Sequence, residues 1–430
     1  MENLEVYTLV VSFLLLLAIG VPVAYSVGMA SLFTILVNIS VGPAFTTIAQ
    51  RMATGLDSFS LLAIPFFVLA GQIMNQGGIA KRLINFAKAL VGSFPGGLAY
   101  VNIIGAMMFG AISGSAMAAV SAIGGSLGPR MEKEGYEKSY SAAVNIASST
   151  TGLVIPPSNI LIVYSLASGG VSIAALFLAG YIPGILMGLA LMLVAAVYAK
   201  IKKYPREKAA SISHMFFSLM DALPSLMMLV VVIGGIVAGI FTATEASGIA
   251  VLYTLVLSFI YKELSVEKLR NILVSSFSTT SVVMLLIACS MSMSWVMAYA
   301  DIPKAVTDGL LSISDNPIII LLLINILLLA VGVFMDMTPA VLIFTPIFLP
   351  VVTAIGIDPV HFGIVMVMNL CIGLCTPPVG SVLFVGIGIA GISLEKVIKP
   401  LIPLFIAMIA VLLLVTYFPQ LSLWLPNLFE

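Results

Sequence analysis

The sequence has 430 residues, of which 61% are hydrophobic and 8% are charged, and its formal net charge is zero. A soluble domain carries about 25% charged residues, so this composition excludes an ordinary globular protein in water and indicates a lipid-exposed exterior. A chain with zero net charge lacks the excess positive charge that attracts nucleic acid, so we expect no nucleic-acid partner. The predicted fold class is an all-α polytopic membrane protein embedded in the lipid bilayer.

Apolar runs long enough to cross a bilayer begin near the first residue. A membrane helix needs about 20 predominantly apolar residues. The first run follows an acidic start rather than the basic start of a secretory signal, so we expect it to be a retained span. Full crossings are predicted at 6–23, 25–43, 59–77, 171–199, 222–242, 247–261, 272–299 and 400–419. Amphipathic segments are predicted along the membrane interface at 44–57, 79–94, 209–221 and 301–315.

Four further apolar stretches are interrupted near their middle. Stretches 139–168 and 360–392 contain Pro-Pro, and each is predicted to be one broken crossing. Stretches 97–128 and 317–355 contain turn-forming residues, and each is predicted to be a re-entrant hairpin. With the N-terminus outside, this arrangement places every Lys and Arg except Arg51 and Lys304 on the inside, as the positive-inside rule requires. Both termini are therefore predicted to be periplasmic.

The two interrupted regions form an internal repeat. When the chain is aligned with itself at an offset of 221 positions, Pro129 meets Pro350, and Gly-Leu-x-x-Pro-Pro at 152–157 meets the same pattern at 373–378. In the topology above, the two copies run in opposite directions across the membrane. This is an inverted-topology repeat, an architecture common among secondary transporters.

The helix breaks and hairpin tips are the candidate cation sites. Proline removes a backbone donor, and the carbonyls it frees are tolerated at membrane depth only in a protein-lined cavity or on a ligand. Neutral oxygens without carboxylates suit Na⁺ better than Mg²⁺ or Ca²⁺. One sodium site is predicted from Ser113, Gly114, Thr151, Gly152, Ile155 and Pro156, and a second from Met337, Thr338, Gly373, Thr376 and Pro377.

A solute site is predicted between the two cation sites. Its candidate residues are Ser113, Ser115, Ser158, Asn159, Asp336 and Thr338. Half-helices starting after Ser115, Ser158 and Thr338 would direct their positive dipole ends at an anion. Asp336 keeps two interpretations: it contacts the solute or a cation, as intramembrane carboxylates often do, or it caps the returning helix. Glu245 is expected to be structural, in the first turn of a helix capped by Thr242 or Thr244.

The chain resembles the large membrane subunit of tripartite ATP-independent periplasmic (TRAP) transporters. The resemblance rests on residues 110–159 and 332–384. It includes Phe-Gly-Ala-Ile-Ser-Gly-Ser at 109–115, Val-Ile-Pro-Pro-Ser at 154–158, Phe-Met-Asp at 334–336 and Gly-Leu-Cys-Thr-Pro-Pro-Val-Gly at 373–380. It implies a bacterial inner-membrane importer, not an enzyme, for a small organic anion of the C4-dicarboxylate or sialic acid class. It also implies an elevator mechanism and two or more sodium ions as coupling ions, with no resident cofactor. The implied partners are a small four-helix membrane subunit and a periplasmic solute-binding protein.

The resemblance and the repeat together divide the chain into scaffold and transport parts. The predicted parts are scaffold helices at 1–77, an arm at 78–96, the first transport repeat at 97–170, scaffold and connecting helices at 171–299, a second arm at 300–316, the second transport repeat at 317–392, and a final span with an outer tail at 393–430. A single-chain sodium/dicarboxylate symporter, a proton-coupled antiporter and a purely structural subunit remain alternatives. An intramembrane enzyme is disfavoured, because we find neither a carboxylate pair nor an H-E-x-x-H motif.

Overall fold

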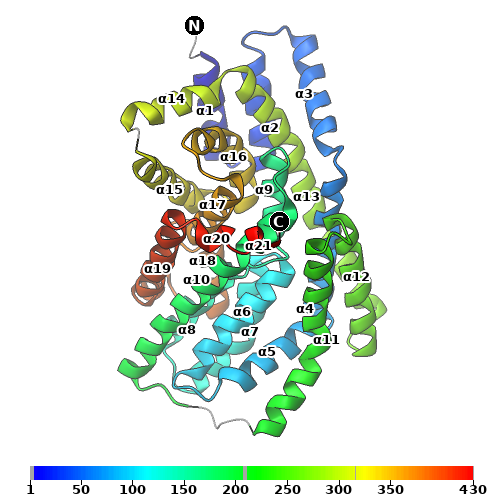
Figure 1. The fold of residues 1–430 in the computed structure, drawn as a ribbon, viewed down its shortest axis with the longest axis vertical. Coiled ribbons are helices and arrows are strands. Elements are labelled where there is room, and N and C mark those ends of the chain that lie inside the picture. Colours follow the sequence, from blue (N-terminus) through cyan, green and yellow to red (C-terminus); the bar gives the residue numbers. More distant parts are fainter. Residues whose placement is uncertain (1–3, 207–210, 315, 430) are drawn as a thin grey trace.

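A computed structural model describes residues 4–206, 211–314 and 316–429. Over these ranges the chain consists of α-helices and one short 3-10 helix, without a β-strand (Figure 1). Eight of the described helices are long and apolar enough to cross a membrane. The predicted class, an all-α polytopic membrane protein, is confirmed.

One group of helices, here called the scaffold, comes from the segments predicted as scaffold and connecting helices, 1–77 and 171–299, without residues 173–202, which pack mainly against repeat helices and the last span. In this group α13 packs against α2, α3 and α4, while α12 packs against α4 and α11. The group consists of α1 (Leu4–Ala18), α2 (Val23–Ile35), α3 (Val41–Leu56), η1 (Phe59–Leu62), α4 (Ala63–Gln76), α11 (Ile212–Val237), α12 (Ala243–Ile260) and α13 (Val266–Tyr299). Thr242 and Glu245 form a reciprocal capping box at the start of α12, which confirms the structural role expected for Glu245.

The boundary predicted near residue 222 is wrong. The interfacial segment 209–221 and the following span were expected to be separate, but residues 212–237 form the single helix α11. The Ser211 hydroxyl starts this helix by accepting a hydrogen bond from the His214 N–H at 3.1 Å. Apolar residues such as Phe216 and Met220 continue the helical pattern into the span, so no local signal ends the helix at 221. Residues 209 and 210 of the predicted segment lie outside the described ranges.

The two repeats have the same order of elements: an arm, a helical hairpin and an interrupted helix. The first repeat contains the arm α5 (Ile79–Val91), the hairpin helices α6 (Gly97–Ser113) and α7 (Ala116–Lys133), and the interrupted helix α8 (Lys138–Thr151) and α9 (Asn159–Ala167). The second contains α14 (Ile302–Ile313), α15 (Pro317–Phe334), α16 (Met337–Ala354), α17 (Pro359–Gly373) and α18 (Ser381–Ala390). Helices α15 and α16 are each long enough to cross a membrane, so their length does not decide whether the second hairpin is re-entrant.

The two repeats interlock through their interrupted helices. Helix α9 of the first repeat packs against α16 of the second, and α18 of the second packs against α7 and α8 of the first (Figure 1). Helices α10 (Ile173–Lys202) and α19 (Leu394–Tyr417) also pack against repeat helices, and the short helices α20 (Gln420–Leu423) and α21 (Pro426–Phe429) contact α10. The interrupted helices are therefore held between the two hairpins.

Matching glycines bring each hairpin against the interrupted helix of its own repeat. A Cβ atom built on Gly152 would lie 2.5 Å from the Cα of Gly110, and one built on Gly373 would lie 2.5 Å from the Cα of Gly332. The two pairs are equivalent in the repeat. Only glycine allows backbones to approach this closely, as at small-residue contacts between membrane helices.

A second pair of equivalent contacts is polar and fully buried. The Ser148 hydroxyl donates to the Asn102 Oδ1 at 2.9 Å in the first repeat. The Asn369 amide donates to the Asn325 Oδ1 at 2.7 Å in the second. Asn325 in turn donates to the Thr416 hydroxyl at 3.1 Å, which connects the second repeat to α19. Since a buried polar group without a partner is costly, these bonds fix how each hairpin lies on its interrupted helix.

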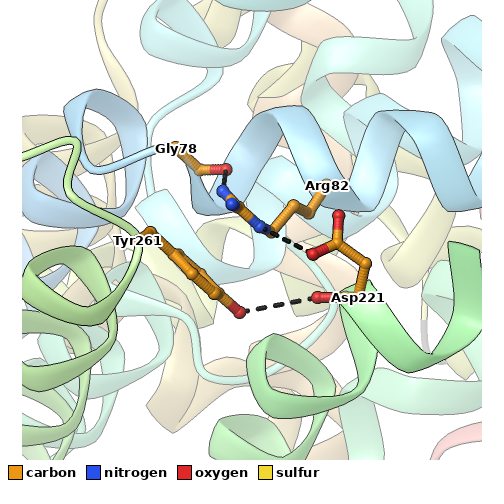
Figure 2. A network of polar contacts seen from close by, with 4 residues as sticks. All are labelled: Gly78, Arg82, Asp221 and Tyr261. Carbon is orange, nitrogen blue, oxygen red and sulfur yellow. Dashed lines mark hydrogen bonds and ion pairs between the residues drawn. The ribbon is translucent and has the colours of Figure 1, made fainter.

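The first arm is attached to the scaffold by a polar clamp around Arg82 (Figure 2). The Arg82 Nε lies 3.0 Å from the Asp221 Oδ1, and its Nη1 donates to the Gly78 carbonyl at 3.0 Å. The guanidinium also lies 3.5 Å from the centre of the Tyr261 ring. This clamp joins the first turn of α5 to α11 and to the end of α12.

Candidate functional site

A cavity of about 260 Å³ lies where both hairpin tips and both interrupted helices meet the scaffold. Its walls come from α4 and α13 on the scaffold side and from the two repeats on the other. The lining residues are Ile64, Val68, Gly71, Gln72, Asn75, Ser113, Gly114, Ser115, Ala116, Met117, Ala118, Leu153, Asn159, Ile160, Val163, Thr279, Val283, Asp336, Met337, Thr338, Leu374, Ser381 and Val382. A concave site with a few convergent polar groups is the usual form of a small-molecule site.

Four half-helices begin at this cavity. The lining includes the first residues of α7, α9, α16 and α18, two helices from each repeat. The Ser115 hydroxyl caps α7 by accepting from the Ala118 N–H at 3.2 Å. Helix N-termini carry a partial positive charge and unpaired N–H groups. The cavity can therefore hold an anion without a cationic side chain.

Five of the six predicted solute residues line the cavity, namely Ser113, Ser115, Asn159, Asp336 and Thr338. The sixth, Ser158, is fully buried and donates its hydroxyl to the Leu153 carbonyl at 2.5 Å. Ser158 does not line the cavity, and its bond shapes the first break instead.

The carboxylate of Asp336 is available to a ligand. Asp336 immediately precedes α16 with extended backbone angles, but its side chain makes no capping hydrogen bond. The residue is exposed and lines the cavity. This placement favours contact with the solute or a cation over the capping interpretation.

Four residues of the first predicted sodium site, Thr151, Gly152, Ile155 and Pro156, lie at the first break, while Ser113 and Gly114 lie at the tip of the first hairpin. The contact between Gly110 and Gly152 brings the end of α6 against this break. No N–H or hydroxyl of the described residues donates to the carbonyl oxygens of Gly152, Ile155 or Pro156. The Thr151 hydroxyl donates to the Ser148 carbonyl at 2.6 Å, which leaves the lone pairs of its oxygen free. These neutral oxygens suit a sodium ion. The sodium site itself stays a prediction.

The second predicted sodium site has the same construction. Gly373 contacts Gly332 at the end of α15, and the Thr376 hydroxyl donates to the Ile372 carbonyl at 2.7 Å. The Thr376 and Pro377 residues are partly exposed, and Met337 is buried at the start of α16. The peptide bonds between the paired prolines are cis in both breaks. The glycine contact and the cis Pro-Pro bond are thus repeated in the two breaks.

Four polar residues of the cavity were missed from the sequence: Gln72 and Asn75 on α4, Thr279 on α13, and Ser381 on α18. Ser381 begins α18 as Asn159 begins α9, but at the repeat offset of 221 positions Ser381 meets Ile160, so the gapless comparison did not pair them. Gln72 and Asn75 are three residues apart and therefore share one face of α4, whose other polar side chain is that of Gln76. That spacing was the available signal.

The chain matches a family model and several relatives along almost its whole length. The model for the tripartite ATP-independent periplasmic transporter, DctM component, matches residues 10–421. The uncharacterized protein YgiK of Salmonella typhimurium is 57% identical over 97% of this chain and 96% of its own. The sialic acid TRAP transporter large permease SiaM of Vibrio cholerae is 40% identical over 96% of each chain. The 2,3-diketo-L-gulonate TRAP transporter large permease YiaN of Escherichia coli is 38% identical over 94% of this chain and 95% of its own.

Solved transporter structures have the same fold. The YdaH transporter of Alcanivorax borkumensis superposes with a TM-score of 0.66 at 11% identity, over 99% of this chain and 98% of that one. MtrF of Neisseria gonorrhoeae superposes with a TM-score of 0.59 at 12% identity, over 87% of this chain and 84% of that one. These likenesses concern the fold alone. The family match and the full-length relatives establish that the chain belongs to the DctM family, the large permease components of TRAP transporters, and is a transporter subunit rather than an enzyme.

Proposed function

We propose that this permease imports a small organic anion together with sodium ions by an elevator movement of the two repeats against the scaffold. The observation that supports this most directly is the convergence of four half-helix N-termini on one cavity, beside two breaks with neutral oxygens. The N-termini suit an anion and the oxygens suit Na⁺. The arms α5 and α14 would connect the moving repeats to the scaffold.

The relatives give the class of solute. Their names specify sialic acid, C4-dicarboxylates, 2,3-diketo-L-gulonate and isethionate, all of them organic acids. The proposed complex also contains the small membrane subunit and a periplasmic solute-binding protein, as the name tripartite implies. We place it in the bacterial inner membrane with both termini in the periplasm, as the distribution of Lys and Arg predicts.

Sodium coupling provides the driving force. Moving one elementary charge through 100 mV is worth about 2.3 kcal/mol. Two sodium ions with one monoanion carry one net positive charge inward, so the membrane potential drives the step. A tenfold sodium gradient adds about 1.4 kcal/mol per ion. No nucleotide is needed for this transport.

Uptake into proteoliposomes tests the proposal. The permease is reconstituted with its small subunit, and uptake of organic acids is measured with and without an inward sodium gradient and the cognate binding protein. Uptake that needs both supports the tripartite, sodium-coupled function. Uptake with sodium alone would indicate a single-chain symporter. Uptake driven by a proton gradient without sodium would contradict sodium coupling.

A further inference from the structure

A second hollow of the molecule lies between the scaffold and the second repeat. It has a volume of about 780 Å³, and we call it the lateral groove. Its lining residues fall within 6–18 of α1, 293–297 of α13, 330–335 of α15 and 343–347 of α16, together with Ile302 at the start of α14. The groove therefore separates helices that the proposed function treats as fixed from helices that it treats as moving.

The lateral groove is apolar throughout. Every described side chain that lines it is aliphatic, aromatic or a methionine. Its floor is buried at Leu9, Met293 and Ile343, whereas its rim is exposed, with 57% of Leu14 and 68% of Phe334 accessible. An apolar hollow offers water no hydrogen bonds and stays dry. Since α13, α15 and α16 are long and apolar enough to cross a membrane, hydrocarbon is the medium that fills the groove.

The length of the groove matches one leaflet of a bilayer. The lining residues of α1 run from Val6 to Ala18, which is about 18 Å of helix. The hydrocarbon core of a bilayer is about 30 Å thick, so each leaflet contributes about 15 Å. With the N-terminus outside, as the distribution of Lys and Arg predicts, the groove runs through the outer leaflet.

The lining suits an acyl chain better than a helix of another protein. Helices that pack in a membrane approach each other through small residues, as this chain does at Gly110 and Gly152. The described lining of the groove has Ala18 and Ala330 as its small residues, without Gly, Ser or Thr, and consists otherwise of large side chains. A flexible chain adapts to such an uneven surface, whereas a rigid helix does not.

A cationic side chain lies near the outer end of the groove. Lys304 follows Ile302 by two residues in the first turn of α14, is exposed and forms no ion pair with a described residue. Lysine binds phosphate groups through its charge. Among molecules with an acyl chain, this position therefore favours a phospholipid.

We propose that a phospholipid of the outer leaflet binds in the lateral groove, with one acyl chain between α1 and the second hairpin and its phosphate beside Lys304. The binding site stands on the groove itself, but one consequence rests on the proposed function. A fluid chain lets the second repeat slide past α1, because it prevents their side chains from interlocking. The chain also contacts Met335, which adjoins Asp336 of the cavity described above.

Native mass spectrometry of the complex of permease and small subunit tests the binding. The delipidated complex is titrated in detergent with palmitoyl-oleoyl phosphatidylethanolamine and with palmitoyl-oleoyl phosphatidylglycerol, and the bound phospholipids are counted. Ala330→Trp and Ala18→Trp each place an indole in the groove, from opposite sides. Because the chain then has to enter an overpacked site, each variant should weaken the binding of one phospholipid by about tenfold or more.

Two further variants complete the test of binding. Ala410→Trp is the matched control, because Ala410 is exposed on the spanning helix α19 and does not line the groove; it should bind phospholipid as the unchanged complex does. Lys304→Gln should weaken the same binding by about 2–5-fold. Melting temperatures report whether each variant keeps its fold.

The outcomes decide the proposal in its parts. Equal phospholipid binding by the unchanged complex and both folded groove variants would overturn it. Loss of the small subunit from the groove variants would also overturn it, since the groove would then hold a helix of that subunit. Unchanged binding by Lys304→Gln would overturn the position of the phosphate.

Uptake into proteoliposomes separates this proposal from the proposed function. Slower uptake of organic acids by folded Ala330→Trp than by Ala410→Trp is expected, and equal uptake would overturn the role of the chain as a sliding contact. A complex that binds the phospholipid but transports no organic acid would contradict the proposed function and leave the lipid site intact.

Discussion

Replacing Gly152 by alanine should force the first hairpin away from its interrupted helix. The new Cβ would lie 2.5 Å from the Cα of Gly110 and 2.8 Å from the backbone N of Ala111. Carbon atoms in contact normally lie about 3.5–4.0 Å apart, so the two backbones would have to separate by about 1 Å. Gly152 has right-handed helical angles, so alanine brings no backbone strain and the effect comes from the contact alone.

The expected cost follows from this displacement. Overpacking of a close contact costs about 1–3 kcal/mol. Each kcal/mol lowers the melting temperature by about 2–4 °C in a domain of about 200 residues, and by less in a longer chain. We expect Gly152→Ala to lower the melting temperature of the purified complex by about 2–6 °C. Gly373→Ala should do the same, because its Cβ would lie 2.5 Å from the Cα of Gly332.

Gly125→Ala is the matched control on the exposed face of α7. A Cβ at Gly125 meets nothing within 4 Å, and alanine is favoured over glycine inside a helix by about 1 kcal/mol. This variant should therefore keep or raise the melting temperature. Thermal unfolding of all three variants, followed by scanning fluorimetry, is the assay. A melting temperature of Gly152→Ala equal to or above that of Gly125→Ala would refute the reasoning.

Four further substitutions test the site, the arm and the buried polar contacts. Asp336→Asn should reduce sodium-driven uptake about tenfold or more at unchanged melting temperature, since bonds to a charged group contribute about 1.5–3 kcal/mol; unchanged uptake would remove Asp336 from the mechanism. Arg82→Gln should lower the stability by about 1–2 kcal/mol through loss of the contacts with Asp221 and Tyr261, and the loss should shrink at high salt. The stability of Arg82→Lys should lie between those of the unchanged protein and Arg82→Gln, because lysine keeps the charge but not the planar stacking. Equal stability of these three proteins at low salt would show that the clamp contributes nothing. Asn325→Leu should cost about 1–3 kcal/mol because it removes the partner of a buried Asn369 N–H, and an unchanged unfolding midpoint would contradict that account.

Local features of the sequence were sufficient for the class and the layout of the repeats. The apolar runs identified most membrane helices, since the bilayer requires a minimum apolar length. The paired prolines at 156–157 and 377–378 located both breaks, because proline cannot continue the backbone hydrogen bonding of a helix. The family followed from motifs in the same regions. The start of α11 was misplaced because its apolar pattern continues across residue 221 without a stop signal.

The contacts between the repeats could not be deduced from a single alignment offset. Gly110 and Gly332 are 222 positions apart, Asn102 and Asn325 are 223 apart, and the breaks match at 221. Small differences in element length shift each pair out of register in a gapless comparison. Their equivalence became visible only when both hairpins were seen packed on their interrupted helices.

The sequence by itself determined that this protein is a membrane transporter subunit with two repeats, because those conclusions depend on composition, spacing and local backbone chemistry. The tertiary structure decided which side chains share the cavity. It placed Ser158 in a buried bond, left Asp336 uncapped and brought Gln72 and Asn75 of the scaffold opposite the hairpin tips. Such neighbours come from helices far apart in the chain, and their meeting depends on helix packing, which no local pattern of residues encodes.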